Sequence, residues 1–241
     1  MQTSRFANWF FGRGLSIACN LKWGVPIEWN GLSREEKISR IKEALRTEMA
    51  APGTDSSVIR DQLRILENNT TSDWKHYFLT TNWDYLLQKE ISDLKLKVLP
   101  SWLKSSHVYH LNGTVEVLPD NSNRSPFLLE EDPASERCWT VEANVAYNNI
   151  ISQRLFIVVG MSFECDTDKF LLTALNRVQD DLPIGESTWF VLNSDKSALD
   201  LSCQRLGQAL PCAKIEGIHC NLQSWVKDRR PELQNHGVLV F

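Results

Sequence analysis

The chain has 241 residues and a formal net charge of −4, with 42% apolar and 23% charged residues. These are ordinary values for a globular protein with a substantial core, and the negative charge gives no reason to expect a nucleic acid or an anionic membrane as a partner. No apolar run reaches the roughly 18 residues that a membrane-spanning helix needs. Residues 1–14 lack the long apolar stretch of a secretory signal, so we expect a cytoplasmic protein.

The six cysteines include no C-x-x-C pair, so neither a zinc ribbon nor a thioredoxin-type redox motif is predicted. We expect reduced thiols that pack as small apolar side chains.

The first third of the chain predicts one strand and two helices. Residues 8–12 form a short apolar run that ends in glycine. Ser33 and Glu36 have the spacing of a capping box ahead of a helical apolar pattern over residues 38–49. A second helix is predicted over residues 58–67.

The rest of the chain alternates strand-like apolar runs with helix-like segments. Strands are predicted over residues 76–81, 96–100, 107–113, 154–162, 188–193 and 213–217. Helices are predicted over residues 83–91, 140–153, 166–179, 195–210 and 222–228, and an apolar run at 237–241 closes the chain. Residues 120–136 are rich in Asp, Asn, Ser and Pro and predict an exposed loop.

This β-α-β-α order predicts an α/β protein. The run 154–162 is continuously apolar at its centre, which indicates a strand covered on both faces, as in a parallel sheet. We therefore predict a Rossmann-like, doubly wound, mainly parallel sheet in a single domain, residues 1–241. Because both early helices fall between the first two strands, residues 33–70 are predicted to form a small helical insertion module beside the sheet.

Polar and glycine-rich clusters follow the predicted strands, at the edge of the sheet where ligands bind in such folds. They comprise Gly12, Arg13, Gly14 and Ser16; Thr80, Asn82 and Asp84; His110; Gly160 and Ser162; and Asn193. Each cluster alone has a structural explanation, namely a tight turn or a helix cap. Their occurrence at successive strand ends predicts a ligand site.

The glycine loop has the chemistry of an anion cradle. Gly12 and Gly14 would let the backbone approach a phosphate closely, and a helix beginning near Ser16 would direct its N–H groups at an anion. The loop lacks the third glycine of a full G-x-G-x-x-G and the G-K-[ST] of a Walker A motif. Taken alone, it therefore also fits a plain structural turn.

Taken in order, the segments GRGLS…WGVP, TTNWD, HLNG, VVGMS and VLN resemble the motif set of the sirtuin-like NAD-consuming proteins over nearly the whole chain. The resemblance implies a Rossmann-like sheet with a small helical module and NAD bound in an extended cleft. It assigns Gly12, Gly14 and Ser16 to the diphosphate and adjoining ribose, Gly160, Ser162 and Asn193 to the adenosine half, Asn82 and Asp84 to the nicotinamide-ribose pocket, and His110 to the ribose hydroxyls. Thr80 belongs to the polar cluster that faces the ligand.

This sequence departs from the usual pattern of the family at three places. Arg13 replaces a small alanine of the family and would either pair with the diphosphate or obstruct the pocket. The zinc module of paired cysteines in protein-deacylating members is missing, since Cys138 is the only cysteine between Gly113 and Val158. FECDTDKF stands where those members hold an acyl-lysine peptide. The chain therefore resembles the zinc-free, prokaryotic-type branch, whose members commonly hydrolyse NAD and often belong to antiphage defence systems.

The same residues suggest a mechanism. The nicotinamide of NAD is cationic and leaves as a neutral molecule, so hydrolysis needs no general acid and no pair of carboxylates of the usual glycosidase kind. Asn82 would hold a water or a ribose hydroxyl, His110 would accept a proton near neutral pH, and Asp84 would hydrogen-bond the nicotinamide carboxamide.

Three functions remain open at this point. The first is an NAD glycohydrolase that releases nicotinamide and ADP-ribose, with Asn82 and His110 as catalytic residues. The second, motivated by Arg13, is a module that binds NAD or ADP-ribose without turnover, as a sensor or an assembly subunit. The third is a Rossmann oxidoreductase, which the incomplete glycine loop disfavours. A homo-oligomer or a partner defence subunit is expected to control a hydrolase of this kind.

Overall fold

The structure is a computed structural model. It describes residues 5–22, 31–93, 108–115, 127–129, 132, 155–165, 168–169, 171–173, 175–176, 187–228 and 231–241. The strand expected at 96–100 and the helix expected at 140–153 lie outside these residues.

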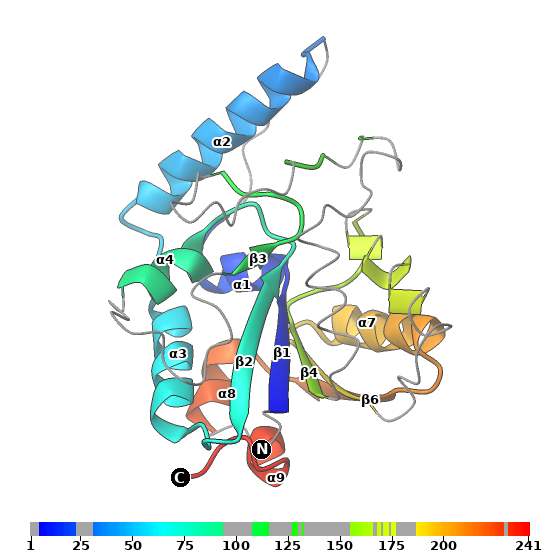
Figure 1. The fold of residues 1–241 in the computed structure, drawn as a ribbon. Coiled ribbons are helices and arrows are strands. Elements are labelled where there is room, and N and C mark those ends of the chain that lie inside the picture. Colours follow the sequence, from blue (N-terminus) through cyan, green and yellow to red (C-terminus); the bar gives the residue numbers. More distant parts are fainter. Residues whose placement is uncertain are drawn as a thin grey trace.

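Six parallel strands form one sheet in the order β3-β2-β1-β4-β5-β6 (Figure 1). The strands are β1 (Arg5–Phe11), β2 (Trp74–Thr80), β3 (Tyr109–His110), β4 (Leu155–Val159), β5 (Thr188–Asn193) and β6 (Lys214–His219). The first half of the chain builds outward from β1 on one side, and the second half builds outward from β4 on the other. The predicted Rossmann-like, doubly wound α/β fold is therefore confirmed.

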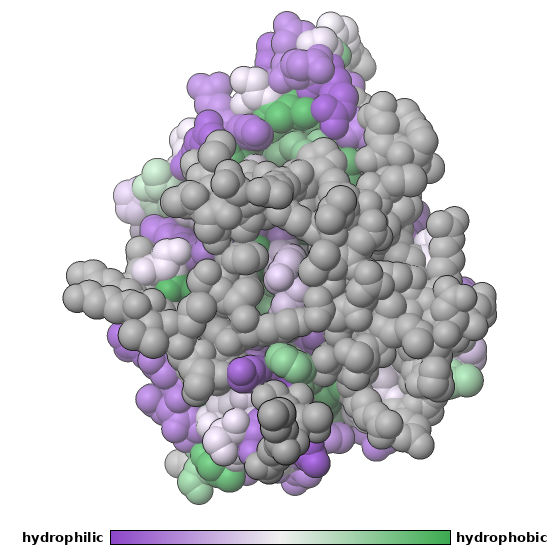
Figure 2. All heavy atoms as spheres, in the orientation of Figure 1, coloured by the Kyte–Doolittle hydropathy of each residue, from purple (hydrophilic) through white to green (hydrophobic). Residues whose placement is uncertain are grey.

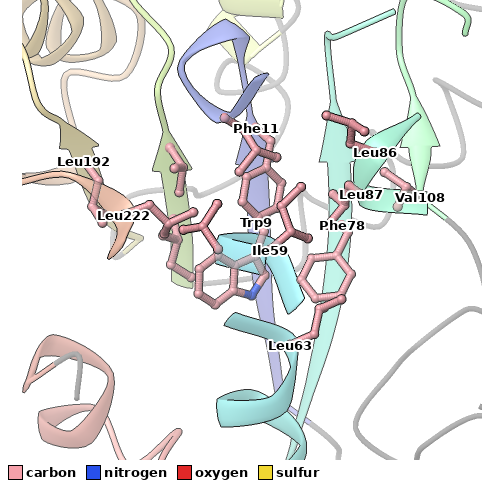
Figure 3. Packing of buried hydrophobic residues seen from close by; sticks show 14 of the residues in the cluster. Trp9, Phe11, Ile59, Leu63, Phe78, Leu86, Leu87, Val108, Leu192 and Leu222 are labelled. Carbon is pink, nitrogen blue, oxygen red and sulfur yellow. The ribbon is translucent and has the colours of Figure 1, made fainter. Parts of the chain in front are cut away.

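The central strands are apolar on both faces because helices cover both faces of the sheet. Along β1, Trp9 and Phe11 point to one face and Phe10 to the other. Figure 3 shows the first face, where Phe78 of β2 and Ile59 of a covering helix join Trp9 and Phe11. On the opposite face the Phe156 and Trp189 rings stack with centroids 4.1 Å apart. This two-sided burial explains the continuous apolar runs in the sequence.

The helices are α1 (Arg13–Ala18), α2 (Arg34–Ala50), α3 (Ser57–Asn69), α4 (Leu86–Asp93), α7 (Lys196–Ala209), α8 (Leu222–Lys227) and α9 (Pro231–Asn235). Helices α3, α4 and α8 supply buried residues to the first face of the sheet, and α7 supplies them to the second, together with residues 171 and 175 of a further helical segment. None of the helices in the described parts of the chain is long and apolar enough to cross a membrane.

The two helices between β1 and β2 have different positions. Ser33 caps α2 in a capping box with Glu36, as the sequence predicts. α2 projects beyond the sheet in Figure 1, and polar residues predominate at the projecting end of the molecule in Figure 2. α3 instead lies on the sheet, with Leu63 and Leu66 fully buried. The crossover helix of the β1–β2 connection is thus α3.

Two local predictions need correction. Residues 107–113 predict a longer strand than β3, which pairs with β2 only through Tyr109 and His110. Residues 120–136 predict an exposed loop, yet Leu128, Leu129 and Asp132 within it are buried. Local composition suggested exposure there, but contacts with distant parts of the chain cover these side chains.

Candidate functional site

The candidate site lies at the carboxyl edge of the sheet, where β1 and β4 are neighbours and the strand order reverses. Gly12 follows β1 and Gly160 follows β4. α1 begins directly after Gly12 and lies at this edge in Figure 1, where β3 also ends. The polar clusters predicted from the sequence are therefore brought to one edge.

Asn82 lies at the centre of a hydrogen-bonded network that joins the loops after β1 and β2. Its Nδ2 donates to the carbonyl oxygen of Gly12 at 2.9 Å and to Oγ of Ser16 at 3.0 Å. Because a carbonyl oxygen only accepts hydrogen bonds, Nδ2 rather than Oδ1 has to face Gly12. Both amide hydrogens are used in this way, so Oδ1, an acceptor, is the atom that Asn82 can offer to a ligand.

Ser16 and Asp84 continue the network into the protein. Ser16 Oγ donates to Oδ2 of Asp84 at 2.6 Å, and Oδ1 of Asp84 accepts from the backbone N–H of Leu86 at 3.1 Å. Burial raises the pKa of the Asp84 carboxyl, while the hydrogen bonds from Ser16 and Leu86 act in the opposite direction. Asp84 therefore orients Ser16 and holds the first turn of α4.

Thr80 links the same two loops at the end of β2. Its Oγ1 donates to the carbonyl oxygen of Phe11 at 2.9 Å and accepts from the backbone N–H of Asn82 at 3.1 Å. The hydroxyl is buried, so its role in the structure is to fix the backbone of Asn82 relative to the end of β1.

His110 ends the neighbouring strand β3, in register with Thr80. The side chain is 2% exposed. The next backbone N–H, that of Leu111, donates to the carbonyl oxygen of Thr80 at 2.8 Å. The imidazole is thereby carried on the strand next to the one that leads to Asn82.

The glycines bring the loops after β1 and β4 into direct backbone contact. Gly14 N–H donates to the carbonyl oxygen of Gly160 at 2.8 Å. A Cβ at Gly14 would lie 2.5 Å from Cα of Gly160, and a Cβ at Gly12 would lie 2.4 Å from Cγ of Met161. Gly160 has φ +64°, a left-handed conformation that favours glycine. All three glycines are thus required by the packing at the switch point.

The remaining predicted residues lie around this centre. Arg13 is exposed at the start of α1, so its side chain is not packed in the core. Ser162 is half-buried, and its carbonyl oxygen accepts from Nη1 of Arg205 at 2.9 Å. Asn193 is the last residue of β5, and its Oδ1 accepts from the backbone N–H of Asp195 at 3.0 Å, at the turn that leads into α7.

Several supporting residues could not be identified from the sequence. Asn112 Nδ2 donates to the carbonyl oxygen of Thr81 at 3.0 Å, and Thr114 Oγ1 donates to that of Trp83 at 3.0 Å. On the other side of the site, Ser202 of α7 donates to the carbonyl oxygen of Met161 at 2.6 Å. These residues bind backbone rather than ligand, and no spacing pattern marks them. The HLNG segment was the nearest signal, since it contains Asn112.

In the part of the chain that the structure describes, no three His, Cys, Asp or Glu side chains form a group that could hold a metal ion.

No family model and no curated protein matches the chain. Solved structures do match it. One, described as "Sir2-p53 peptide-NAD+", has a TM-score of 0.50 and 14% identity, and the match covers 98% of this chain and 95% of that chain. The chain has a sirtuin-like fold. A second, described as "Structural Basis for the Mechanism and Regulation of Sir2 Enzymes", has a TM-score of 0.49 and 15% identity over 97% of this chain and 94% of that chain.

The sirtuin-like fold agrees with the resemblance that the sequence motifs indicate. At 14% identity the likeness concerns the arrangement of helices and strands, and the chemistry of this chain has to be argued from its own residues.

Proposed function

We propose that this chain binds NAD at the carboxyl edge of its sheet and hydrolyses the nicotinamide–ribose bond, giving nicotinamide and ADP-ribose. The observation that carries the proposal is the network in which Asn82 is fixed by Gly12 and Ser16, on the strand end next to His110. The solved structure of similar fold whose description names NAD+ supports the choice of ligand.

The fixed amide of Asn82 gives it a specific role. Because Nδ2 is held by Gly12 and Ser16, Oδ1 is the atom that could accept a hydrogen bond from a ligand. A ribose hydroxyl or the attacking water can donate to it, whereas a phosphate or carbonyl oxygen would be repelled. We propose that Asn82 holds one of these O–H groups at the reacting ribose.

His110 would then act as the proton acceptor. An imidazole exchanges protons near neutral pH, and a positioned base of this kind contributes about 10²–10⁴-fold in rate. Its proton would come from a ribose hydroxyl or from the attacking water. The departing nicotinamide needs no proton, so the remaining requirement is to stabilise the positive charge that develops on the ribose.

The diphosphate would lie at the β1–α1 turn. Gly12 and Gly14 bring backbone to this point, and the exposed side chain of Arg13 could turn toward a bound anion without disturbing the core. Ser16 and Asp84 would act indirectly, since their polar atoms are engaged with Asn82, with each other and with Leu86. Gly160, Ser162 and Asn193 would line the adenosine half.

An NAD-consumption assay tests the proposal. Wild-type protein should release nicotinamide and ADP-ribose, and the Asn82→Ala and His110→Ala variants should each lower the rate by at least about tenfold. Ser197→Ala, an exposed change on α7, is the matched control and should keep the wild-type rate. Wild-type rates in His110→Ala would remove the imidazole from the mechanism.

A binding module without turnover is the second candidate. It is favoured by the internal hydrogen bonds of Ser16 with Asp84, and of Thr80 with the backbone of Phe11 and Asn82, which leave few polar groups for chemistry. Thermal stabilisation by NAD or ADP-ribose without product would support it. For the hydrolase, we further propose a role as an effector in antiphage defence, held inactive in the cytoplasm by a homo-oligomer or a partner subunit.

A further inference from the structure

Helix α2 is linked to the loop that carries Asn82 by a set of contacts that begins with a buried carboxylate. Arg34 forms a two-pronged ion pair with Asp132, with Nε 2.6 Å from Oδ1 and Nη2 2.7 Å from Oδ2. The Asp132 side chain is 2% exposed. Such parallel hydrogen bonds between charged groups fix geometry as well as adding energy, so Arg34 holds Asp132 in one orientation.

The same arginine also holds the backbone near Asp132. Nη2 of Arg34 donates to the carbonyl oxygen of Phe127 at 2.7 Å. Asp132 Oδ2 accepts from the backbone N–H of Leu129 at 2.8 Å, and the N–H of Leu128 donates to the carbonyl oxygen of Asn112 at 3.0 Å. Residues 127–129 are therefore tied both to α2 and to the chain after β3.

Phe127 links these residues to the Asn82 loop. Its ring stacks on the ring of Trp83, with centroids 5.0 Å apart and an interplanar angle of 26°. Lys42 of α2 places Nζ 5.3 Å from the centroid of the same Phe127 ring, in cation–π contact. Trp83 directly follows Asn82 in the chain, so the position of its ring bears on the backbone of Asn82.

A second contact runs from α2 to the same residue. Nη2 of Arg46 donates to the carbonyl oxygen of Val115 at 2.7 Å. The N–H of Val115 in turn donates to the carbonyl oxygen of Trp83 at 2.9 Å. Arg34, Lys42 and Arg46 thus all reach Trp83 through one intermediate residue.

We propose that Arg34 is a positioning residue of the site: by pairing with Asp132 it holds Phe127 against Trp83 and so fixes the loop that presents Asn82. This rests on the proposed function for its catalytic consequence, but its mechanical part does not. The Asn82 loop is then held at two residues, at Asn82 by Ser16 and Gly12 and at Trp83 by the contacts with α2. Arg34 touches no ligand in this scheme.

Amide hydrogen exchange on the full chain tests the mechanical part. In Arg34→Ala, the N–H groups of Asn82, Val115 and Leu128 should exchange at least about tenfold faster, because local opening becomes easier. Arg40→Ala removes an exposed arginine of the same helix and should leave these rates unchanged. Asp132→Asn, which keeps the shape of the side chain and removes its charge, should act in the same direction as Arg34→Ala.

Kinetics of NAD cleavage test the positioning part. Because misplacing a catalytic group by about 1 Å costs up to about 100-fold, we expect Arg34→Ala to lower kcat at least about tenfold with a smaller change in KM. Arg34→Lys keeps the charge without the two-pronged geometry and should recover part of kcat.

Two results would overturn the inference. Unchanged exchange at Val115 and Leu128 in both Arg34→Ala and Asp132→Asn would remove the mechanical link. Faster exchange with wild-type kcat would show that the link does not position Asn82. Absence of NAD cleavage by the wild-type protein would instead refute the proposed hydrolase, and the exchange rates would still decide whether Arg34 holds the loop.

Discussion

Two pairs of loops meet at the candidate site, and different kinds of contact hold each pair together. After β1 and β2, side chains make the connections, through Ser16, Asn82, Asp84 and Thr80. Between β1 and β4, backbone meets backbone, and Gly14 and Gly160 leave no space for a Cβ. Loss of a side-chain hydrogen bond creates no steric clash between the first pair of loops, whereas a methyl group added between the second pair would force the backbone to move.

The largest effect is therefore expected on the packed side. In Gly160→Ala the new Cβ would meet the backbone of Gly14, and the residue would have to keep φ +64°. Overpacking and left-handed strain together should lower the free energy of unfolding by about 2–4 kcal/mol. Urea denaturation measures this. Gly53→Ala is the control, because nothing lies within 4 Å of its Cβ position, and an equal loss in both variants would contradict the explanation.

A smaller loss of stability is expected where side-chain hydrogen bonds connect the loops after β1 and β2. Ser16→Ala would remove the donor to Asp84 and the acceptor for Asn82, both of which are buried. Leaving these groups without their partner should cost about 1–3 kcal/mol in the free energy of unfolding. The same denaturation experiment measures it, with exposed Ser197→Ala as the matched change. A loss larger than that of Gly160→Ala would reverse the proposed ranking.

The pH dependence of stability tests the contribution of Asp84 to the hydrogen-bonded pair of loops. Burial raises the pKa of Asp84 in the folded protein above its unfolded value of about 3.9. Between these two pKa values the folded protein holds a proton that the unfolded chain has released, so this group's contribution to the free energy of unfolding falls as pH rises through the window. Asp84→Asn does not titrate and should lose this dependence.

Denaturation at several pH values compares the two proteins. Stability of Asp84→Asn relative to wild type should improve as pH rises from about 4 toward neutrality. The opposite trend would mean that the hydrogen bonds from Ser16 and Leu86 outweigh burial and lower the pKa of Asp84.

The smallest effect is expected from removing metal ions. Cys138 is the only cysteine between Gly113 and Val158, so that part of the sequence lacks three of the four thiolates that a zinc site of paired cysteines needs. Treatment with a chelator should leave the thermal unfolding midpoint and the rate of NAD cleavage unchanged. A drop in either would show that other residues bind a metal.

The sheet could be predicted because burial on both faces leaves a continuous apolar run. Residues 188–193 are predicted as a strand and form β5, and residues 154–162 include β4. The strand ends, and with them the polar clusters, follow from these runs. The short α9 could not be predicted, because five residues provide too little periodicity to reveal a helix.

The use of each polar atom at the site could not be predicted. Ser16 and Asp84 are 68 residues apart, and only their distance in space shows that the hydroxyl serves the carboxylate. The sequence suggests that both face a ligand, whereas in the structure both make hydrogen bonds to other groups of the protein. The contact of Phe127 with Trp83 could not be predicted for a similar reason, since Phe127 lies in a segment, residues 120–136, whose composition indicates an exposed loop.

The C-terminal segment packs at the amino edge of the sheet, opposite the edge that carries the glycine turns. Thr71 N–H donates to the carbonyl oxygen of Val238, and Val240 N–H donates to that of Asn69, beside the start of β2. A fluorophore or affinity tag joined after Phe241 would therefore be remote from Asn82 and His110. Surface-immobilised protein attached in this way would present its carboxyl edge to solution, which suits ligand titrations by surface methods.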